Sequence, residues 1–164
     1  MAEEFVIDKS QPVEKQYEEL SIVIKNLLNK HDNILSNLSN FTAALKQTFD
    51  KINWAGFYLF DEEKLYLGPF QGKVACTQID LGKGVCGTSA LSRKTIIAGD
   101  VNKFPGHIVC DSDSKSEIVI PLIKNNKLLG VLDIDSASFN AFDETDKKYL
   151  EDICNFLTEE IFLR

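Results

Sequence analysis

The sequence lacks long apolar runs and an excess of basic residues, and each absence argues against a class of protein. No apolar stretch approaches the roughly 20 residues that span a bilayer. Residues 1–5 have neither the basic start nor the apolar run of a secretory signal peptide. The 18 Lys and Arg are outnumbered by 25 Asp and Glu, so the chain would repel a phosphate backbone. We therefore expect a soluble, cytoplasmic protein without a membrane or nucleic-acid partner.

Close cysteine pairs of the Cys-x-x-Cys type are also absent, although the chain has four cysteines, at positions 76, 86, 110 and 154. In a reducing cytosol they are not expected to build a structural disulfide framework. Metal binding, redox chemistry and core packing remain as candidate roles. Cys154 shares an apolar helical stripe with Leu150 and Leu157, so we assign it to the core.

No repeat, low-complexity tract or linker divides the chain, and we expect a single domain over residues 1–164. Hydrophobic periodicity and turn residues predict helices, strands and one long loop. The predicted helices are 12–29, 33–49, 84–92 and 143 to the C-terminus; the predicted strands are 53–60, 64–70, 95–98, 117–123 and 127–135; the loop is 102–116. Because strict β-α-β alternation is absent, we predict an α+β fold with a mainly antiparallel sheet flanked by helices.

Three of the cysteines lie beside turn-forming residues, with Cys86 inside GKGVCG and Cys110 inside GHIVCD. A loop can expose a thiol and aim backbone N–H groups at it, which lowers its pKa and makes it nucleophilic. The alternative is that each is a small buried hydrophobe, the commonest fate of a free cysteine. A zinc site built from Cys76, Cys86, His107 and Cys110 is a third interpretation. Structural zinc ligands usually come in close pairs, however, and only His107-x-x-Cys110 approaches that spacing.

The segment 82–87 also matches the dinucleotide-binding pattern G-x-G-x-x-G. That pattern requires a preceding strand, a full helix after it and parallel strands beyond. Only about one and a half helical turns fit before Thr95. We interpret the segment as a tight turn into a short helix and expect no cofactor.

Two aspartates interrupt an apolar strand near the C-terminal end of the sheet. Period two puts Asp133 and Asp135 on the same face as Leu129 and Val131. Buried carboxylates are costly unless they are paired. Either the strand end emerges into solvent, or the pair lines a pocket for a cationic group such as an amino acid's ammonium.

Glu117 opens the partner strand, and its orientation depends on the turn. A strict two-residue turn at Asn125-Asn126 pairs Ile118 with Asp133 and leaves Glu117 on the opposite face. A bulge would reverse that orientation. The sequence leaves both arrangements open.

Trp54 and Tyr58 share one face of the first strand, with Gly56 between them. The glycine would leave a hollow floored by two aromatic rings, suited to a small apolar or sulfonium-like group. Ordinary core packing is the alternative.

Taken together, these segments resemble the free methionine-(R)-sulfoxide reductases, enzymes built on the GAF fold. The resemblance covers about residues 15–160, the expected core of the domain, and rests on these blocks: NWAGFY (53–58), GPFQG (68–72) leading to Cys76, GKGVCG (82–87), HIVCD (107–111), SEIVIP (116–121) and GVLDIDS (130–136). Most GAF domains lack the three cysteines, which makes the motifs specific.

The resemblance implies a role for each cysteine. Cys110 matches the cysteine that attacks the sulfoxide, Cys76 its usual resolving partner, and Cys86 a third cysteine that can take part in disulfide exchange. The substrate site implied by the same match consists of acidic and aromatic residues: Glu117, Asp133, Asp135, Trp54 and Tyr58. Which cysteine pair forms first, and whether Glu117 or Asp135 is the general acid, stays open.

The implied reaction is thiol-dependent reduction of free L-methionine-(R)-sulfoxide to methionine. It proceeds through a sulfenic acid and an intramolecular disulfide that thioredoxin recycles, and it needs neither a metal nor a cofactor. Family members often dimerise, but the sequence does not fix the oligomeric state. A non-catalytic GAF-type metabolite sensor is the alternative; sensors are normally attached to an output domain, which we do not expect here.

Overall fold

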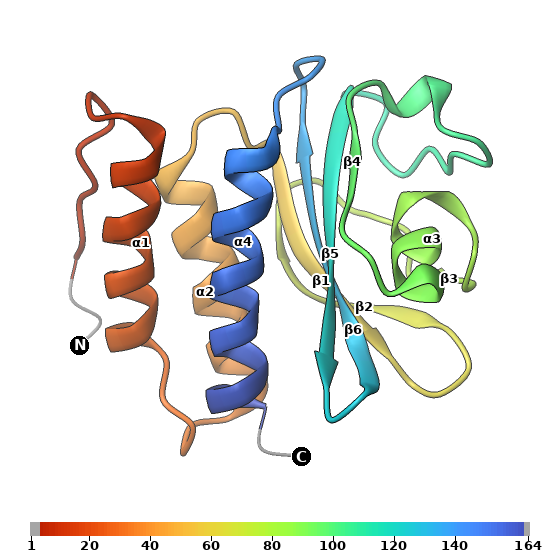
Figure 1. Ribbon diagram of the computed structural model, residues 1–164. Coiled ribbons are helices and arrows are strands. Elements are labelled where there is room, and N and C mark those ends of the chain that lie inside the picture. Colours follow the sequence, from red (N-terminus) through yellow and green to blue (C-terminus); the bar gives the residue numbers. More distant parts are fainter. Residues whose placement is uncertain (1–3, 163–164) are drawn as a thin grey trace.

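Two long helices lie on one face of a six-stranded antiparallel sheet, a third long helix packs outside them, and a short helix with long loops covers the other face (Figure 1). The structure is a computed structural model that describes residues 4–162. The strand order is β3-β2-β1-β6-β5-β4, and every neighbouring pair is antiparallel. The predicted α+β class with a mainly antiparallel sheet is therefore confirmed.

The helices are α1 (Val13–Leu27), α2 (Ile34–Thr48), α3 (Gly84–Ser92) and α4 (Glu144–Phe156), with a 3₁₀ turn at Val101–Lys103 and a π-helical turn at Leu157–Ile161. The strands are β1 (Trp54–Phe60), β2 (Leu65–Gln71), β3 (Gln78–Ile79), β4 (Ile96–Ala98), β5 (Ser116–Lys124) and β6 (Lys127–Ser136). All predicted elements are present within about two residues, and the bounds of α3 agree fully. The short strand β3 was not predicted.

Local signals account for where the helices begin. The side chain of Asn33 accepts a hydrogen bond from the N–H of Leu35 at the start of α2. Asp143 and Asp146 form a reciprocal capping box at the start of α4. The amphipathic stripe of α1 buries Tyr17, whose hydroxyl donates to Asp146 at 2.6 Å and links the first helix to the last.

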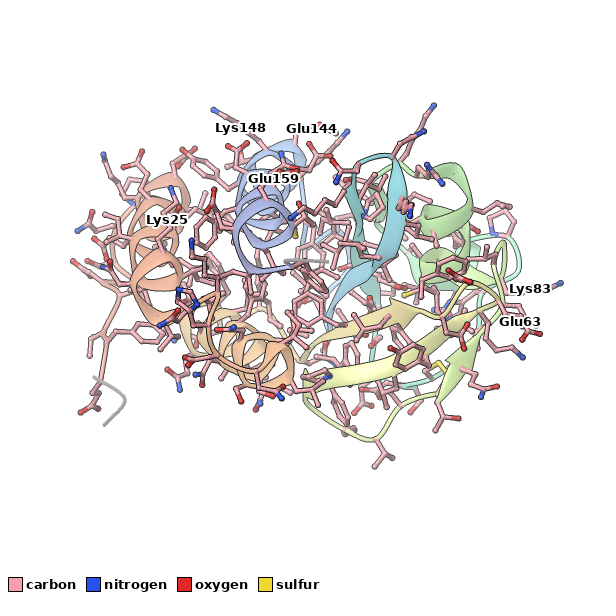
Figure 2. The ribbon with its side chains drawn as sticks, turned by 90° about the horizontal axis from the view of Figure 1, so that it is seen from below. Lys25, Glu63, Lys83, Glu144, Lys148 and Glu159 are labelled. Atoms are coloured by element: carbon pink, nitrogen blue, oxygen red, sulfur yellow. A yellow bond between two sulfur atoms is a disulfide. The ribbon has the colours of Figure 1, made fainter. Side chains whose placement is uncertain are left out.

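The larger hydrophobic core lies between the helices α1, α2 and α4 and the sheet. It includes Leu20, Leu38, Phe41, Phe57 and Cys154, all of them buried, so the assignment of Cys154 to the core is confirmed. The exposed charged side chains labelled in Figure 2 lie on the outside of the layers. No helix among residues 4–162 is long and apolar enough to cross a membrane.

A β-bulge near the β5–β6 hairpin sets the direction of the acidic side chains. Ile123 pairs with Leu128, but Leu122 already pairs with Gly130, which makes Leu129 the extra residue. Gly130 has a φ of +153°, and a Cβ there would lie 2.3 Å from the carbonyl oxygen of Tyr58. Glycine therefore allows the bulge to pack against β1.

The bulge decides between the two arrangements that the sequence leaves open. Val119 now pairs with Asp133, and Glu117 pairs with Asp135. The strict pairing of Ile118 with Asp133 is wrong, since Ile118 pairs with Ile134 instead. All three carboxylates therefore point to the face of the sheet that α3 covers.

Candidate active site

A pocket lies between the sheet and α3, on the face opposite the long helices. Strands β1, β5 and β6 form its floor, the first turn of α3 forms a wall, and the loops before β3 and β5 complete it. Seven of the eight residues predicted for the site line this pocket: Trp54, Tyr58, Cys86, Cys110, Glu117, Asp133 and Asp135. The eighth, Cys76, is bonded to Cys110. The structure thus brings together segments as far apart in the sequence as Trp54 and Asp135.

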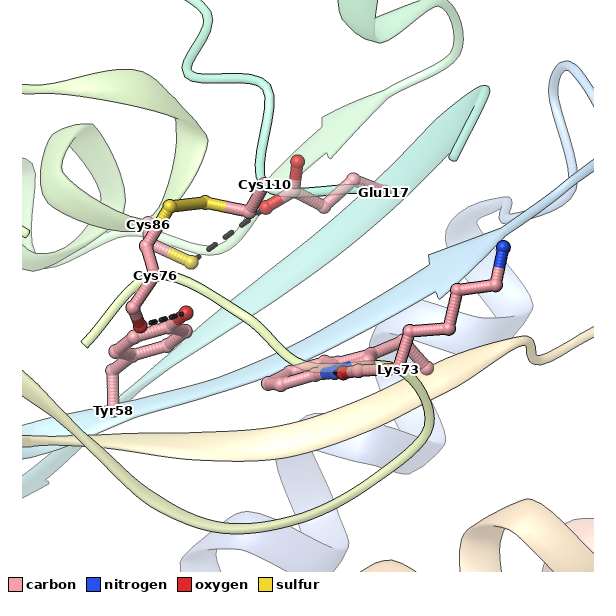
Figure 3. The surroundings of a disulfide bond; sticks show 7 residues. Tyr58, Lys73, Cys76, Cys86, Cys110 and Glu117 are labelled. Atoms are coloured by element: carbon pink, nitrogen blue, oxygen red, sulfur yellow. Dashed lines mark hydrogen bonds between the residues drawn. A yellow bond between two sulfur atoms is a disulfide. The ribbon is translucent and has the colours of Figure 1, made fainter. Parts of the chain in front are cut away.

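A disulfide joins Cys76 and Cys110 across the mouth of the pocket (Figure 3). Its Cα atoms are 5.6 Å apart, and it ties the loop after β2 to the loop before β5. Both cysteines are half-buried, so a second thiol can approach the bond. The zinc interpretation is wrong as a four-residue set, because two of its sulfurs are bonded to each other.

Other contacts hold the same two loops. The hydroxyl of Tyr58 donates to the carbonyl of Cys76 at 3.0 Å, and the indole N–H of Trp54 donates to the carbonyl of Lys73 at 3.0 Å (Figure 3). The ammonium of Lys73 pairs with Asp113 and lies 4.0 Å from Asp111 on the other loop. The loop that carries Cys76 is therefore anchored from both sides.

Cys86 lies in the first turn of α3, below the disulfide, with 4% of its surface exposed. Its thiol donates to a carboxylate oxygen of Glu117 over 3.6 Å. Burial, together with the charges of Asp133 and Glu117, raises the pKa of Cys86 well above its ordinary value. In this state Cys86 is a neutral thiol and not an activated nucleophile.

The carboxyl groups of Glu117 and Asp133, both buried, and of Asp135, half-buried, line the pocket together. Burial, reinforced by neighbouring carboxylates, raises the pKa of Glu117 and that of Asp135. Burial raises the pKa of Asp133 to about 6, and its Oδ1 atom has no hydrogen-bond partner. Within residues 4–162, no Lys, Arg or His forms an ion pair with any of the three. The pocket therefore favours protons or a cationic ligand.

The aromatic wall differs from the hollow expected at Gly56. A Cβ at Gly56 would lie 2.4 Å from the ring of Trp54, because the indole folds over the glycine and fills that space. The indole stacks on Phe70 with ring centroids 5.3 Å apart and on Tyr58 at 6.1 Å. Phe70 was not predicted from the sequence as a neighbour of the site. Phe70 pairs with Gly56 across β1 and β2, and this strand pairing would have predicted its position.

Three further polar residues of the 102–116 loop line the pocket outside the predicted site set: Ser114, and His107 and Asp111 of the HIVCD block. Asp111 lies close enough for its charge to raise the pKa of Asp135. His107 is partly buried, and burial lowers its pKa. His107 and Asp111 flank Cys110 in the sequence, so the HIVCD block was the sequence feature from which both could have been predicted as site residues.

The first turn of α3 offers hydrogen-bond donors to the same pocket. The N–H of Gly84 is bonded to the carbonyl of Gly106, and that of Gly87 to Lys83. Among the described residues, the N–H groups of Val85 and Cys86 have no such acceptor, as is normal at a helix start. Segment 82–87 is thus a turn into a short helix, as expected, and its free N–H groups favour an anion.

With the disulfide closed, the cavity measures about 40 Å³. A water molecule needs about 10–15 Å³ on the same measure. The oxidised pocket therefore has room for a few waters, and entry of an amino acid requires movement of the two loops that the disulfide joins.

Comparisons with known proteins identify the family. Residues 38–159 match the family model described as "GAF domain". The chain is 53% identical to GAF domain-containing protein A of Dictyostelium discoideum, covering 96% of this chain and 99% of that protein. It is 47% identical to free methionine-R-sulfoxide reductase of Saccharomyces cerevisiae, covering 89% of this chain and 86% of that protein. The X-ray structure of free methionine-R-sulfoxide reductase from Neisseria meningitidis, in complex with its substrate, superposes with a TM-score of 0.91 at 39% identity, covering 95% of this chain and 93% of that one.

Proposed function

Because the chain belongs to the GAF-domain family of free methionine-R-sulfoxide reductases, we propose that it reduces free L-methionine-(R)-sulfoxide to methionine, with Cys110 as the nucleophile. One observation supports this function above all. A disulfide between two half-buried cysteines lies at the mouth of a pocket whose floor holds two buried carboxyl groups, Glu117 and Asp133, and the half-buried carboxyl of Asp135. Within residues 4–162 none of the three forms an ion pair. A redox-active thiol pair and a site for an ammonium group thus occur together.

The reaction begins from the reduced protein, in which Cys76 and Cys110 carry thiols. The thiolate of Cys110 attacks the sulfoxide sulfur, and the oxygen is transferred to the cysteine sulfur as methionine leaves. This step reduces the sulfoxide by two electrons and oxidises Cys110 to a sulfenic acid. The thiol of Cys76 then displaces water from the sulfenic acid and forms the disulfide. The 5.6 Å separation of the two Cα atoms suits that second step.

A carboxylic acid in the pocket protonates the sulfoxide oxygen as that oxygen is transferred to Cys110. Burial and the neighbouring carboxylates raise the pKa values of Glu117 and Asp135, which favours the protonated form that a general acid requires. Glu117 accepts a hydrogen bond from the thiol of Cys86 and pairs with Ala98 of β4. Asp135 is influenced by the charge of Asp111, in the loop that carries Cys110. Both remain candidates for the proton donor.

Recognition of the free amino acid uses both of its charges. The unpaired Oδ1 of Asp133 accepts a hydrogen bond from the ammonium, and the N–H groups of Val85 and Cys86 donate to the carboxylate. Trp54 and Tyr58 hold the apolar methyl end. A peptide-bound methionine sulfoxide lacks both charges and would leave these groups unpaired, so it would be a poor substrate.

Thioredoxin returns the protein to its reduced state by exchange with the Cys76–Cys110 disulfide. The half-buried position of both sulfurs at the surface supports this step. Cys86 takes part only as a third thiol that can exchange with the pair. We propose a cytoplasmic location, where thioredoxin keeps thiols reduced. We also propose a homodimer, on the family resemblance alone. Light scattering of the purified protein tests whether it is a dimer.

The experiment measures methionine release from the separate (R) and (S) epimers of free L-methionine sulfoxide, with a thioredoxin system regenerating the thiols. We expect turnover of the (R) epimer alone. Cys110→Ser should abolish it, whereas Cys154→Ala, which removes a thiol from the core on the other side of the sheet, should keep it. Absence of turnover with folded, reduced protein would refute the proposal and favour a GAF-type sensor.

A further inference from the structure

Cys86 is the one pocket thiol that neither attacks the sulfoxide nor forms the disulfide. It is nevertheless held in place, since its sulfur contacts Glu117 and its backbone lies in the first turn of α3. Asp133 lies beside the same pair on β6. These three side chains come from three different elements, α3, β5 and β6, and converge in the pocket. Figure 3 shows two of them, Cys86 and Glu117, beside the disulfide.

The three side chains present a set of metal-ligand atoms. The sulfur of Cys86 and one oxygen each from Glu117 and Asp133 all lie within 4.8 Å of one another. In a tetrahedral zinc site with ordinary bond lengths, a sulfur and an oxygen ligand are about 3.5 Å apart. The Cys86–Glu117 separation is 3.6 Å, so one edge of such a site already has the right length.

An independent observation indicates that the cluster accommodates a cation. The Oδ1 atom of Asp133 is buried and has no hydrogen-bond partner, which is rare for a polar atom inside a protein. No ion pair neutralises Asp133, Asp135 or Glu117 within the described residues. A metal ion bound by the Asp133 carboxylate would give that buried group a partner and would offset the negative charge of the cluster.

We propose that the pocket holds a zinc-class divalent ion on Cys86, Glu117 and Asp133, and that this ion occupies the space of the substrate's ammonium. A sulfur ligand with two carboxylates selects Zn²⁺ or the softer Cd²⁺ over Mg²⁺ and Ca²⁺. On binding, the thiol of Cys86 releases its proton to solvent and coordinates as a thiolate. Exposed residues at the pocket rim, such as Val74 and Lys83, provide an entry path. The ion would make the reductase sensitive to zinc.

The test uses the oxidised protein, in which the Cys76–Cys110 disulfide leaves Cys86 as the only free thiol of the pocket. Cd²⁺ is added while the ultraviolet thiolate-to-metal charge-transfer absorption is recorded, and Zn²⁺ binding is measured by calorimetry. The variants are Cys86→Ser and Asp133→Asn, with Cys154→Ala as the matched control. Circular dichroism checks folding, and the Asp133→Asn variant keeps the test valid if Cys86→Ser does not fold.

We expect one ion per chain and a charge-transfer band in the unmodified protein and in Cys154→Ala. Cys86→Ser should lose the band, and both pocket variants should bind Zn²⁺ at least about tenfold more weakly. Absence of binding, a band that persists in Cys86→Ser, or an affinity that Asp133→Asn leaves unchanged would each overturn the site. No substrate is present in this test, so the metal site and the reductase activity can fail separately.

Discussion

Replacing Asp133 by Asn should stabilise the ligand-free protein at neutral pH. The substitution keeps the shape of the side chain and removes its charge. Asp133 is buried, its Oδ1 has no partner, and no cation offsets it. An uncompensated buried charge costs free energy that the neutral amide does not incur. In the ligand-free protein Asp133 thus lowers stability, as expected of a group that is proposed to bind a cationic ligand.

The magnitude follows from the pKa of Asp133. Burial raises it from 3.8 to about 6, which corresponds to about 3 kcal/mol in the free energy of unfolding. Because the folded-state pKa is raised, the folded protein holds the proton more tightly than the unfolded chain. The stability from this group is fully present below about pH 4 and is lost as the pH rises through 6. Asp133→Asn should thus match the unmodified protein at pH 4 and exceed it by about 3 kcal/mol at pH 7.5.

Urea unfolding at pH 4 and pH 7.5 measures this difference, with EDTA present and the disulfide intact in both proteins. Asp152→Asn on the exposed face of α4 is the matched control and should change little at either pH. An Asp133→Asn protein that is less stable at pH 7.5, or a difference that does not depend on pH, would refute the account of an uncompensated buried carboxylate.

Three other outcomes follow from the structure. Reduction of the Cys76–Cys110 disulfide, which closes a 34-residue separation, should lower the free energy of unfolding by about 3–4 kcal/mol; urea curves with and without reductant measure this, and coincident curves would argue against it. Gly130→Ala should cost about 2 kcal/mol or more, because its Cβ would meet the Tyr58 carbonyl; an unchanged melting temperature would contradict this. Trp54 is the only tryptophan, so methionine sulfoxide should change the fluorescence of the reduced protein; a flat titration at saturating substrate would place the ligand elsewhere.

Sequence periodicity predicted most of the fold because the signals are local. The helix α3 begins at Gly84, a turn residue visible in the sequence, and ends at Ser92, after which Arg93 adopts the left-handed conformation. Asn125 and Asn126 have positive φ angles of 49° and 62°, as the predicted two-residue hairpin requires. Polar caps such as Asp143 fixed the start of the last helix.

The site was less predictable because its geometry depends on tertiary contacts. The orientation of Glu117 is decided by the extra residue Leu129, and that bulge depends on Gly130 packing against β1. The two-residue strand β3 carries too short a pattern to be seen. The hollow expected at Gly56 is filled by the ring of Trp54, two residues before it on the same strand. The alternation of side chains along a strand does not predict how such a ring folds over a glycine. The family resemblance, and not the spacing, pointed to Cys76 and Cys110 as a pair.

A single-turnover experiment tests the central claim most directly. Fully reduced protein, freed of reductant, is mixed with an excess of free L-methionine-(R)-sulfoxide; methionine is counted, and peptide mass mapping identifies the disulfide. The account predicts one methionine per chain, the loss of two thiols and a bond between Cys76 and Cys110, with no product from the (S) epimer. Failure of the folded, reduced protein to form methionine, or product without the loss of thiols, would contradict it.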